Sequence, residues 1–146
     1  KGWFDEYKET FLKEFTFPDL PDERNRERMK EIQGSRSVSI HIRRGDFVDL
    51  GWALTPQNYR GLVERFLEGS GSDWDLFVFS DDMAWCRANF HAVHFIDGNT
   101  RARSYIDMQL MSQCEAMIMS GSSFCYLAAL LNTRRKFVVN PTIRDL

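Results

Sequence analysis

The sequence predicts an α/β fold, a Rossmann-like parallel sheet flanked by helices. From Ser37 onward, short runs rich in β-branched and aromatic residues alternate with stretches of helical periodicity. Such alternation is typical of β-α-β units with right-handed crossovers. A chain of 146 residues with 43% hydrophobic residues is also long enough to bury one sizeable core. We therefore expect one sheet with a ligand crevice beyond the carboxyl ends of its strands.

The segment before Ser37 predicts two helices. Helical spacing runs from Trp3 to Phe15, where a stretch with two prolines interrupts it. Asp22 then caps a second, polar helix, which ends near Gln33. This opening segment is expected to be peripheral to the sheet.

Strands and helices alternate along the rest of the chain. The expected strands are 37–43, 75–80, 92–96, 116–119 and 136–140, and the expected helices are 56–68, 81–90, 104–115 and 122–132. We accordingly divide the chain into a peripheral helical segment, 1–36, and a Rossmann-like domain, 37–146.

Composition excludes several classes of function. A net charge of −2 gives no general attraction to nucleic acid or to anionic lipid, so any positive site must be local. The longest apolar run is too short to span a membrane, and Lys1-Gly2-Trp3 is unlike the start of a signal peptide. The absence of an initiator methionine indicates a processed or truncated chain.

Three cysteines cannot all pair, and Cys86, Cys114 and Cys125 each lie in an apolar segment. We expect buried free thiols in a reducing compartment, and therefore a cytoplasmic protein. No CxxC pair or His/Cys spacing typical of a metal site occurs.

A cluster of charge ends the first expected strand. His41 and Arg43 project from the same face, about 7 Å apart, because side-chain direction repeats every second residue of a strand. Arg43 and Arg44, followed by a glycine that lets the backbone come close, form a clamp for an anion, since an arginine fork matches phosphate oxygens. The alternative is a loop held by an ion pair of either arginine with Asp46 or Asp49.

The second expected strand ends in Ser80-Asp81-Asp82. This sequence resembles the acidic end of a phosphoacceptor sheet. The alternative is structural, because Ser80 or Asp81 is a good N-cap for the helix 81–90.

Asp107 has two interpretations. It follows Ser104 by three residues, the spacing of a capping box. It also shares a helix face with Met111 and Cys114, where a carboxylate could meet a ligand with paired donors, such as the N1–H and 2-amino group of guanine. Spacing alone leaves both possibilities open.

Ser120-Gly121-Ser122-Ser123-Phe124 follows the strand 116–119 and opens a helix. Backbone N–H groups at a helix start, beside hydroxyls and a glycine, form a phosphate site. Simple N-capping by Ser122 is the alternative, and it is compatible with phosphate binding. Neither GxxxxGK[ST] nor GxGxxG occurs, which argues against kinase-like and ordinary dinucleotide-binding proteins.

Two of these motifs together resemble those of a known family. His41-Ile42-Arg43-Arg44-Gly45-Asp46 resembles the HxRRxD motif of fucosyltransferases, and Asp107-x-x-Leu110-Met111-Ser112-x-Cys114 with Ser120-Gly121-Ser122-Ser123-Phe124 resembles their second donor-binding block. Similarity to the α-1,2-fucosyltransferase family also covers the opening Lys1-Gly2-Trp3-Phe4 and the segment Phe79-Ser80-Asp81-Asp82. The chain is identified as a member of that family over nearly its whole length.

The resemblance implies a specific activity. Members transfer L-fucose from GDP-fucose to a galactose hydroxyl of a glycan, with inversion and without a metal or another cofactor. Their GT-B architecture has two lobes, and this chain resembles the carboxyl-terminal, GDP-fucose-binding lobe. The amino-terminal lobe, with its GGxGNQ stretch, has no counterpart here, so the chain alone is expected to be inactive. The resemblance suggests a bacterial-type soluble enzyme without nucleic-acid or membrane partners.

The resemblance also assigns roles to residues. Arg43 would grip the β-phosphate and neutralise charge on the leaving GDP, and Arg44 belongs to the same donor-binding motif. His41 and Asp107 would contact the guanosine end. The remaining assignments are phosphate binding by Ser122 and Ser123 and orientation of the arginines by Asp46.

Two other classes of function remain open at the level of sequence. One is a nucleotide-binding module without catalysis. The other is a receiver-like domain phosphorylated on Asp81 or Asp82; it gives no role to the two arginines or to Ser122.

Overall fold

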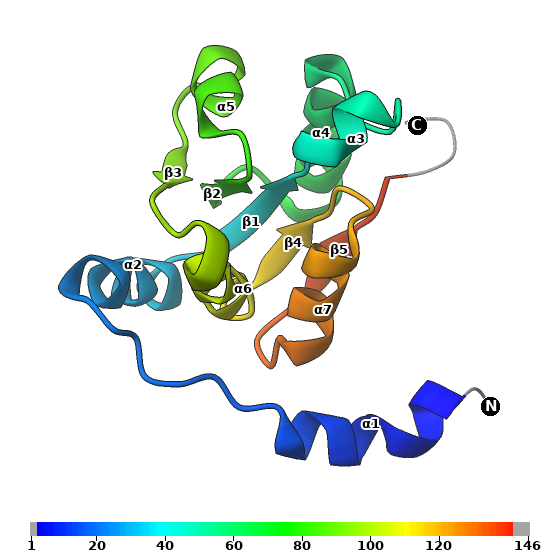
Figure 1. Cartoon of the computed structure of the whole chain (residues 1–146). Coiled ribbons are helices and arrows are strands. Elements are labelled where there is room, and N and C mark those ends of the chain that lie inside the picture. The colour runs from blue at the N-terminus through cyan, green and yellow to red at the C-terminus, as the bar shows by residue number, and fades with distance from the viewer. Residues whose placement is uncertain (1–2, 142–146) are drawn as a thin grey trace.

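The computed structural model describes residues 3–141, and within them five parallel strands form one sheet in the order β3-β2-β1-β4-β5 (Figure 1). The strands are β1 (Ser37–Ile42), β2 (Asp75–Ser80), β3 (His94–Ile96), β4 (Ala116–Ile118) and β5 (Phe137–Val139). The predicted Rossmann-like parallel sheet is confirmed. Every strand except β2 is shorter than expected, and β1 ends at Ile42, one residue before Arg43.

Helices connect and cover these strands. They are α1 (Trp3–Glu14), α2 (Glu23–Gly34), α3 (Gly45–Asp49), α4 (Pro56–Ser70), α5 (Met83–Asn89), α6 (Ser104–Met111) and α7 (Ser123–Leu131), with a 3₁₀ turn, η1 (Arg101–Arg103). Helix α3 and the turn η1 were not expected, because a single turn of helix leaves no periodicity to detect. The expected helix 104–115 ends at Met111 instead, so Cys114 shares no helix face with Asp107 and that prediction was wrong.

Strand β1 lies at the centre of the sheet, and all six of its residues are buried. Val38, Ile40 and Ile42 belong to one hydrophobic cluster, together with residues of α4 and α5. Alternation directs the other three side chains of the strand, among them His41, to the opposite face. That face is covered by α2, α6 and α7, whose apolar residues form the second cluster (Figure 1).

Strand order reverses beside β1. The chain runs from β1 outward to β2 and β3, then crosses back to β4 and β5 on the other side. Ligands of open α/β sheets bind at such a switch point, beyond the carboxyl ends of the strands. In this fold the switch point lies between β1 and β4.

Helix α2 contributes to the core. Asp22 caps it as predicted, its side chain accepting from the backbone N–H of Asn25, and Asn25, Arg28 and Ile32 are buried. The division into 1–36 and 37–146 stays a prediction. Lys1 and Gly2, which open the segment of family resemblance, lie outside the described residues.

Cys86, Cys114 and Cys125 are buried free thiols, as predicted. In the described part of the chain, no helix is both long enough and apolar enough to cross a bilayer.

Candidate functional site

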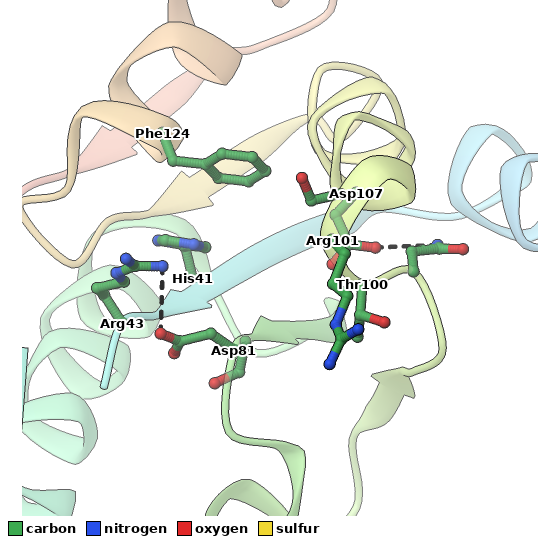
Figure 2. Close-up of a pocket in the computed structure, with 10 residues that line it drawn as sticks. His41, Arg43, Asp81, Thr100, Arg101, Asp107 and Phe124 are labelled. Carbon is green, nitrogen blue, oxygen red and sulfur yellow. Dashed lines mark hydrogen bonds and ion pairs between the residues drawn. The ribbon is translucent and has the colours of Figure 1, made fainter. Parts of the chain in front are cut away.

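A cavity of about 310 Å³ opens at the switch point, at the carboxyl edge of the sheet. Its lining comes from five parts of the chain: His41, Arg43, Ser80, Asp81, Asn99, Thr100, Arg101, Ser104, Asp107 and Phe124. Figure 2 shows Arg43 with Asp81 on one side of the cavity and Asp107, Thr100 and Arg101 on the other. Three of the predicted site residues therefore meet here, namely His41, Arg43 and Asp107.

The guanidinium of Arg43 is held between two carboxylates. Its Nη2 lies 2.8 Å from Oδ1 of Asp46, and its Nη1 lies 3.2 Å from Oδ2 of Asp81. The ion pair with Asp46, foreseen as the structural alternative, is thus confirmed. Because one cation faces two anions, its charge is offset, and displacement of one carboxylate would free the guanidinium for an incoming phosphate. Asp46 is the easier one to displace, since its side chain is 59% exposed and exposed ion pairs contribute only about 0–1 kcal/mol.

Asp81 contacts both arginines, the backbone of Arg44 and the side chain of Arg43. Its Oδ1 accepts from the backbone N–H of Arg44 at 2.8 Å, while its other oxygen pairs with Arg43. A Cβ on Gly45 would lie 2.6 Å from Asp81 Oδ2. Gly45 therefore leaves room for this carboxylate, whereas the sequence had suggested that it made room for the anion. The carboxylate that caps α5 belongs to Asp82, which accepts from Trp85 N–H, so the prediction of Ser80 or Asp81 as cap was wrong.

His41 is buried and neutral. Its Nδ1 lies 2.7 Å from Oγ of Ser120, and its ring stacks on Phe124 at 5.4 Å between centroids. Burial, and next the positive charge of Arg43, lower the pKa of His41 to about 3. It can donate or accept one hydrogen bond but carries no charge near neutral pH.

Asp107 lies in the cavity with only 9% of its surface exposed. Asn99 Nδ2 donates to its Oδ1 at 3.0 Å. Burial raises the pKa of Asp107 to about 7, although the hydrogen bond from Asn99 and the charge of Arg28 act in the opposite direction. Helix α6 has no side-chain cap, so the capping-box interpretation of Asp107 was wrong.

The other predicted site residues do not line the cavity. Arg44 turns away from it, with Nε 3.2 Å from Asp82 Oδ2 and its guanidinium 4.2 Å from the centroid of the Trp85 ring. Ser122 is the N-cap of α7, where its side chain accepts from Phe124 N–H, and Ser123 is exposed. With Asp82 engaged as a helix cap and Asp81 paired with Arg43, neither aspartate resembles a free phosphoacceptor.

Sequence reasoning missed the loop that follows β3. Asn99, Thr100 and Arg101 line the cavity, and Arg101 adopts the left-handed region with φ 55°. Non-glycine residues there are costly and concentrate at functional sites. The only signal in the sequence was Asp97-Gly98-Asn99, which is typical of any tight turn.

Within residues 3–141, no three His, Cys, Asp or Glu side chains gather as ligands for a metal ion would. The positive groups at the cavity are arginines, Arg43 and Arg101. Its charges suit an anionic ligand that ends in a group with hydrogen-bond donors, because Asp107 lies opposite Arg43 (Figure 2).

Comparison with known proteins places the chain in a family context. Residues 2–145 match the sequence model of glycosyl transferase family 11. The O-antigen biosynthesis glycosyltransferase WbnK of Escherichia coli is 32% identical over 118 residues, which cover 75% of this chain and 39% of that protein. An Escherichia coli alpha-1,2-colitosyltransferase is 37% identical over 113 residues, covering 68% of this chain and 38% of the relative. Galactoside alpha-(1,2)-fucosyltransferase 1 of Leontopithecus chrysomelas is 30% identical over 150 residues, covering 88% of this chain and 40% of the relative.

The chain spans about two fifths of the length of these relatives. Among solved structures, the crystal structure of fucosyltransferase NodZ from Bradyrhizobium superposes with a TM-score of 0.50 at 18% identity, over 75% of this chain and 42% of NodZ. A second structure of that protein gives a TM-score of 0.52 at 14% identity, over 85% and 46%. At this identity the similarity supports the fold, which is that of a Rossmann-like lobe of a GT-B enzyme.

Proposed function

Because this chain belongs to glycosyltransferase family 11, we propose that it is the donor-binding lobe of an α-1,2-fucosyltransferase. The whole enzyme would transfer L-fucose from GDP-fucose to a galactose hydroxyl of a glycan, with inversion and without a metal. Names of relatives support the linkage, since two of them are called α-1,2 transferases.

One observation carries the proposal. His41 and Arg43 lie at the carboxyl end of β1 and Asp107 lies on α6, yet all three line one cavity at the switch point of the sheet. The first two were singled out as a phosphate and nucleoside site and the third as a partner for guanine. Their convergence supports a ligand with a diphosphate at one end and a purine with two N–H donors at the other.

The placement of Asp107 and Arg43 on opposite sides of the cavity supports one orientation of this ligand. The guanine would lie on the side of Asp107, whose carboxylate accepts from its N1–H and 2-amino group, with the stacked rings of His41 and Phe124 beside it (Figure 2). The diphosphate would then extend toward Arg43. A charge-assisted bond between guanidinium and phosphate is the strongest contact available there.

Arg43 would also assist the departure of GDP. Negative charge develops on the β-phosphate as the bond to fucose breaks, and a fixed guanidinium stabilises that charge without reorganisation. Asp81, which binds both Arg43 and the backbone of Arg44, would keep the guanidinium in place after Asp46 is displaced. A metal ion would then be unnecessary for this step.

A second donor sugar follows from one relative. The colitosyltransferase is 37% identical to this chain, so colitose is a second candidate for the transferred sugar. The nucleotide end of the site would be the same for either donor. Full-length protein offered both nucleotide sugars would distinguish them by relative turnover.

A nucleotide-binding module without catalysis remains the alternative from another class. GDP affinity does not separate it from a transferase. Turnover by the full-length protein does, because a pure binding module would leave GDP-fucose intact with every galactoside offered.

Calorimetry with GDP, UDP and ADP tests the proposal. We expect weak binding of GDP in clear preference to the other two, because only guanine offers paired donors to Asp107. Equal affinity for all three nucleotides would exclude the guanine role of Asp107. Absence of GDP binding at millimolar concentration would exclude the donor site itself.

A further inference from the structure

A buried chain of polar side chains joins α2 to the cavity. It runs from Asp22 and Arg28 through Asn25 and Asn99 to Asp107. Asn25 and Asn99 exchange two hydrogen bonds, Asn25 Nδ2 to Asn99 Oδ1 at 3.0 Å and Asn99 Nδ2 to Asn25 Oδ1 at 2.9 Å. Both are almost inaccessible, with 1% and 6% of their surfaces exposed.

The charged ends fix the direction of every hydrogen bond in this chain. Arg28 can only donate, and its Nη1 lies 3.2 Å from Oδ1 of Asn25. An ionised Asp22 can only accept, and its two oxygens lie 3.1 and 2.9 Å from Nδ2 of Asn25. These two partners therefore distinguish the oxygen of the Asn25 amide from its nitrogen.

The partners of Asn25 also fix the direction of the hydrogen bonds of Asn99 and Asp107. Since the Asn25 oxygen accepts from Arg28, it faces the nitrogen of Asn99, and that nitrogen also donates to Oδ1 of Asp107 at 3.0 Å. Because Asn99 Nδ2 can only donate, its hydrogen bond favours the ionised form of Asp107, whereas burial disfavours that form. The second oxygen of Asp107 has no hydrogen-bond partner within the described residues and remains for a ligand.

We propose that Asn99 and Asn25 form a relay by which α2 positions the carboxylate of Asp107 and keeps it an acceptor for the base of the bound nucleotide. They are positioning residues and act through Asp107. This inference rests on the proposed guanine site and deepens it. It assigns a function in base selectivity to α2 and to the loop after β3.

The backbone of that loop supports the same conclusion. Arg101 is left-handed, and so is Gly98, where a Cβ would lie 3.0 Å from Nη1 of Arg24. Arg28 Nη2 also binds the carbonyl oxygen of Asp97 at 2.9 Å. A costly loop conformation persists only when its surroundings determine it, and here α2 supplies those contacts.

The test compares binding of GDP and IDP, which lacks the 2-amino group, between pH 5.5 and 8.5. We expect the wild-type chain to prefer GDP at high pH and to lose that preference as Asp107 is protonated. In Asn99→Leu the preference at pH 8 should fall about 10-fold, because a hydrogen bond to a charged group is lost. Its midpoint should also move about one unit toward higher pH, since one unit corresponds to the loss of a single such interaction.

The groups around Asp107 allow its titration to be recognised. Arg28 faces it from α2, Asp97 from the end of β3, and His41 from β1, where the low pKa keeps that ring neutral over this range. Neither arginine nor neutral histidine changes charge between pH 5.5 and 8.5. A shifted midpoint in Asn99→Leu would therefore report on Asp107.

Asn132→Leu is the matched control. Asn132 is also buried, and its Nδ2 donates to the carbonyl oxygens of Met111, the last residue of α6, and of Cys114. It should lower stability with no change in base preference or pH midpoint. Asn25→Leu, one link further from the cavity, should act in the same direction as Asn99→Leu and add nothing in the double variant. Asn25→Leu alone also tests the relay if Asn99→Leu does not fold.

The outcomes separate the relay from the proposed function. Wild-type preference for GDP that persists with the same midpoint in both relay variants would overturn the relay alone. Equal wild-type affinity for GDP and IDP at every pH would overturn the guanine site and the relay together. An equal loss of affinity for both nucleotides in the variants would also count against the relay, because it indicates a general structural effect.

Discussion

At the scale of single residues, the double pairing of Arg43 decides how it can act. Its partners Asp46 and Asp81 hold the guanidinium at the cavity but also offset its charge. Arg43 can therefore act both in ligand binding and in holding the structure together. Only substitution of Arg43 separates the two roles.

Arg43→Ala should weaken GDP binding about 10- to 150-fold, because a charge-assisted hydrogen bond worth about 1.5–3 kcal/mol is lost. Arg43→Lys should recover only part of the affinity, since it keeps the charge but lacks the planar fork. Calorimetry measures both. Arg36→Ala is the control, because Arg36 also pairs with an aspartate and lies over an aromatic ring, at residues remote from the cavity. A lower melting temperature with normal GDP affinity in Arg43→Ala would mean that the residue is structural.

Asp107→Asn should increase stability at alkaline pH while it removes the preference for guanine. The folded-state pKa of Asp107, about 7, lies above its ordinary value of 3.8. The contribution of Asp107 to the free energy of unfolding is therefore complete below the ordinary pKa of 3.8. It is lost as the pH rises through the folded-state pKa of about 7. At pH 8 the variant should gain at most about 4 kcal/mol in free energy of unfolding, and near pH 4 the gain should vanish.

Urea titrations at pH 4 and pH 8 measure this difference. An asparagine at position 107 can still accept from Asn99, so no other contact of the relay need be lost. Asp19→Asn, on an exposed residue, should show no such pH dependence. A variant less stable than the wild type at pH 8 would contradict the burial of a charged carboxylate.

At the scale of elements, α2 carries more than its polar sequence suggests. Its mean composition is hydrophilic, yet Ile32 is fully buried in the cluster with α6 and α7. The helix thus supplies both an anchor in the core and the polar relay to the cavity.

Ile32→Ala tests whether α2 folds with the sheet. Loss of a large buried aliphatic side chain should lower the free energy of unfolding by about 2–5 kcal/mol. Glu31→Ala, on an exposed neighbour in the same helix, is the control and should change stability by less than about 0.5 kcal/mol. Equal effects of the two substitutions in chemical denaturation would show that α2 is a peripheral segment, as the sequence suggested.

At the scale of the whole molecule, the cavity lies at the carboxyl edge of the sheet, and the chain spans about two fifths of the length of its relatives. A transferase must hold donor and acceptor together, and such positioning contributes roughly 7–11 kcal/mol to catalysis. In the proposed two-lobed enzyme, a second lobe would form the other half of this cleft.

We therefore expect the isolated chain to bind GDP yet to form no fucosylated galactoside, even in long incubations followed by mass spectrometry. The full-length protein should form it, and EDTA should leave its rate unchanged. Product formation by the isolated chain would contradict the two-lobe proposal. Loss of activity in EDTA, restored by a divalent cation, would contradict metal independence.

The sequence by itself determined the parallel sheet, the helix caps at Asp22 and Ser122, and the position of His41 and Arg43 at the carboxyl edge of the sheet. These features depend on local chemistry: side-chain periodicity, capping preference and the position of charge at a strand end. Their signals lie within a few neighbouring residues, so they can be recognised without the fold.

Only the tertiary structure decided which groups meet. It paired Arg43 with Asp81, directed Arg44 away from the cavity, and joined Asn25 to Asn99 across 74 positions of the sequence. No local pattern encodes such contacts, because an asparagine in a turn looks the same whether it ends in solvent or in a buried relay. Long-range packing of α2 against the loop after β3 fixed both the burial and the partners of Asp107.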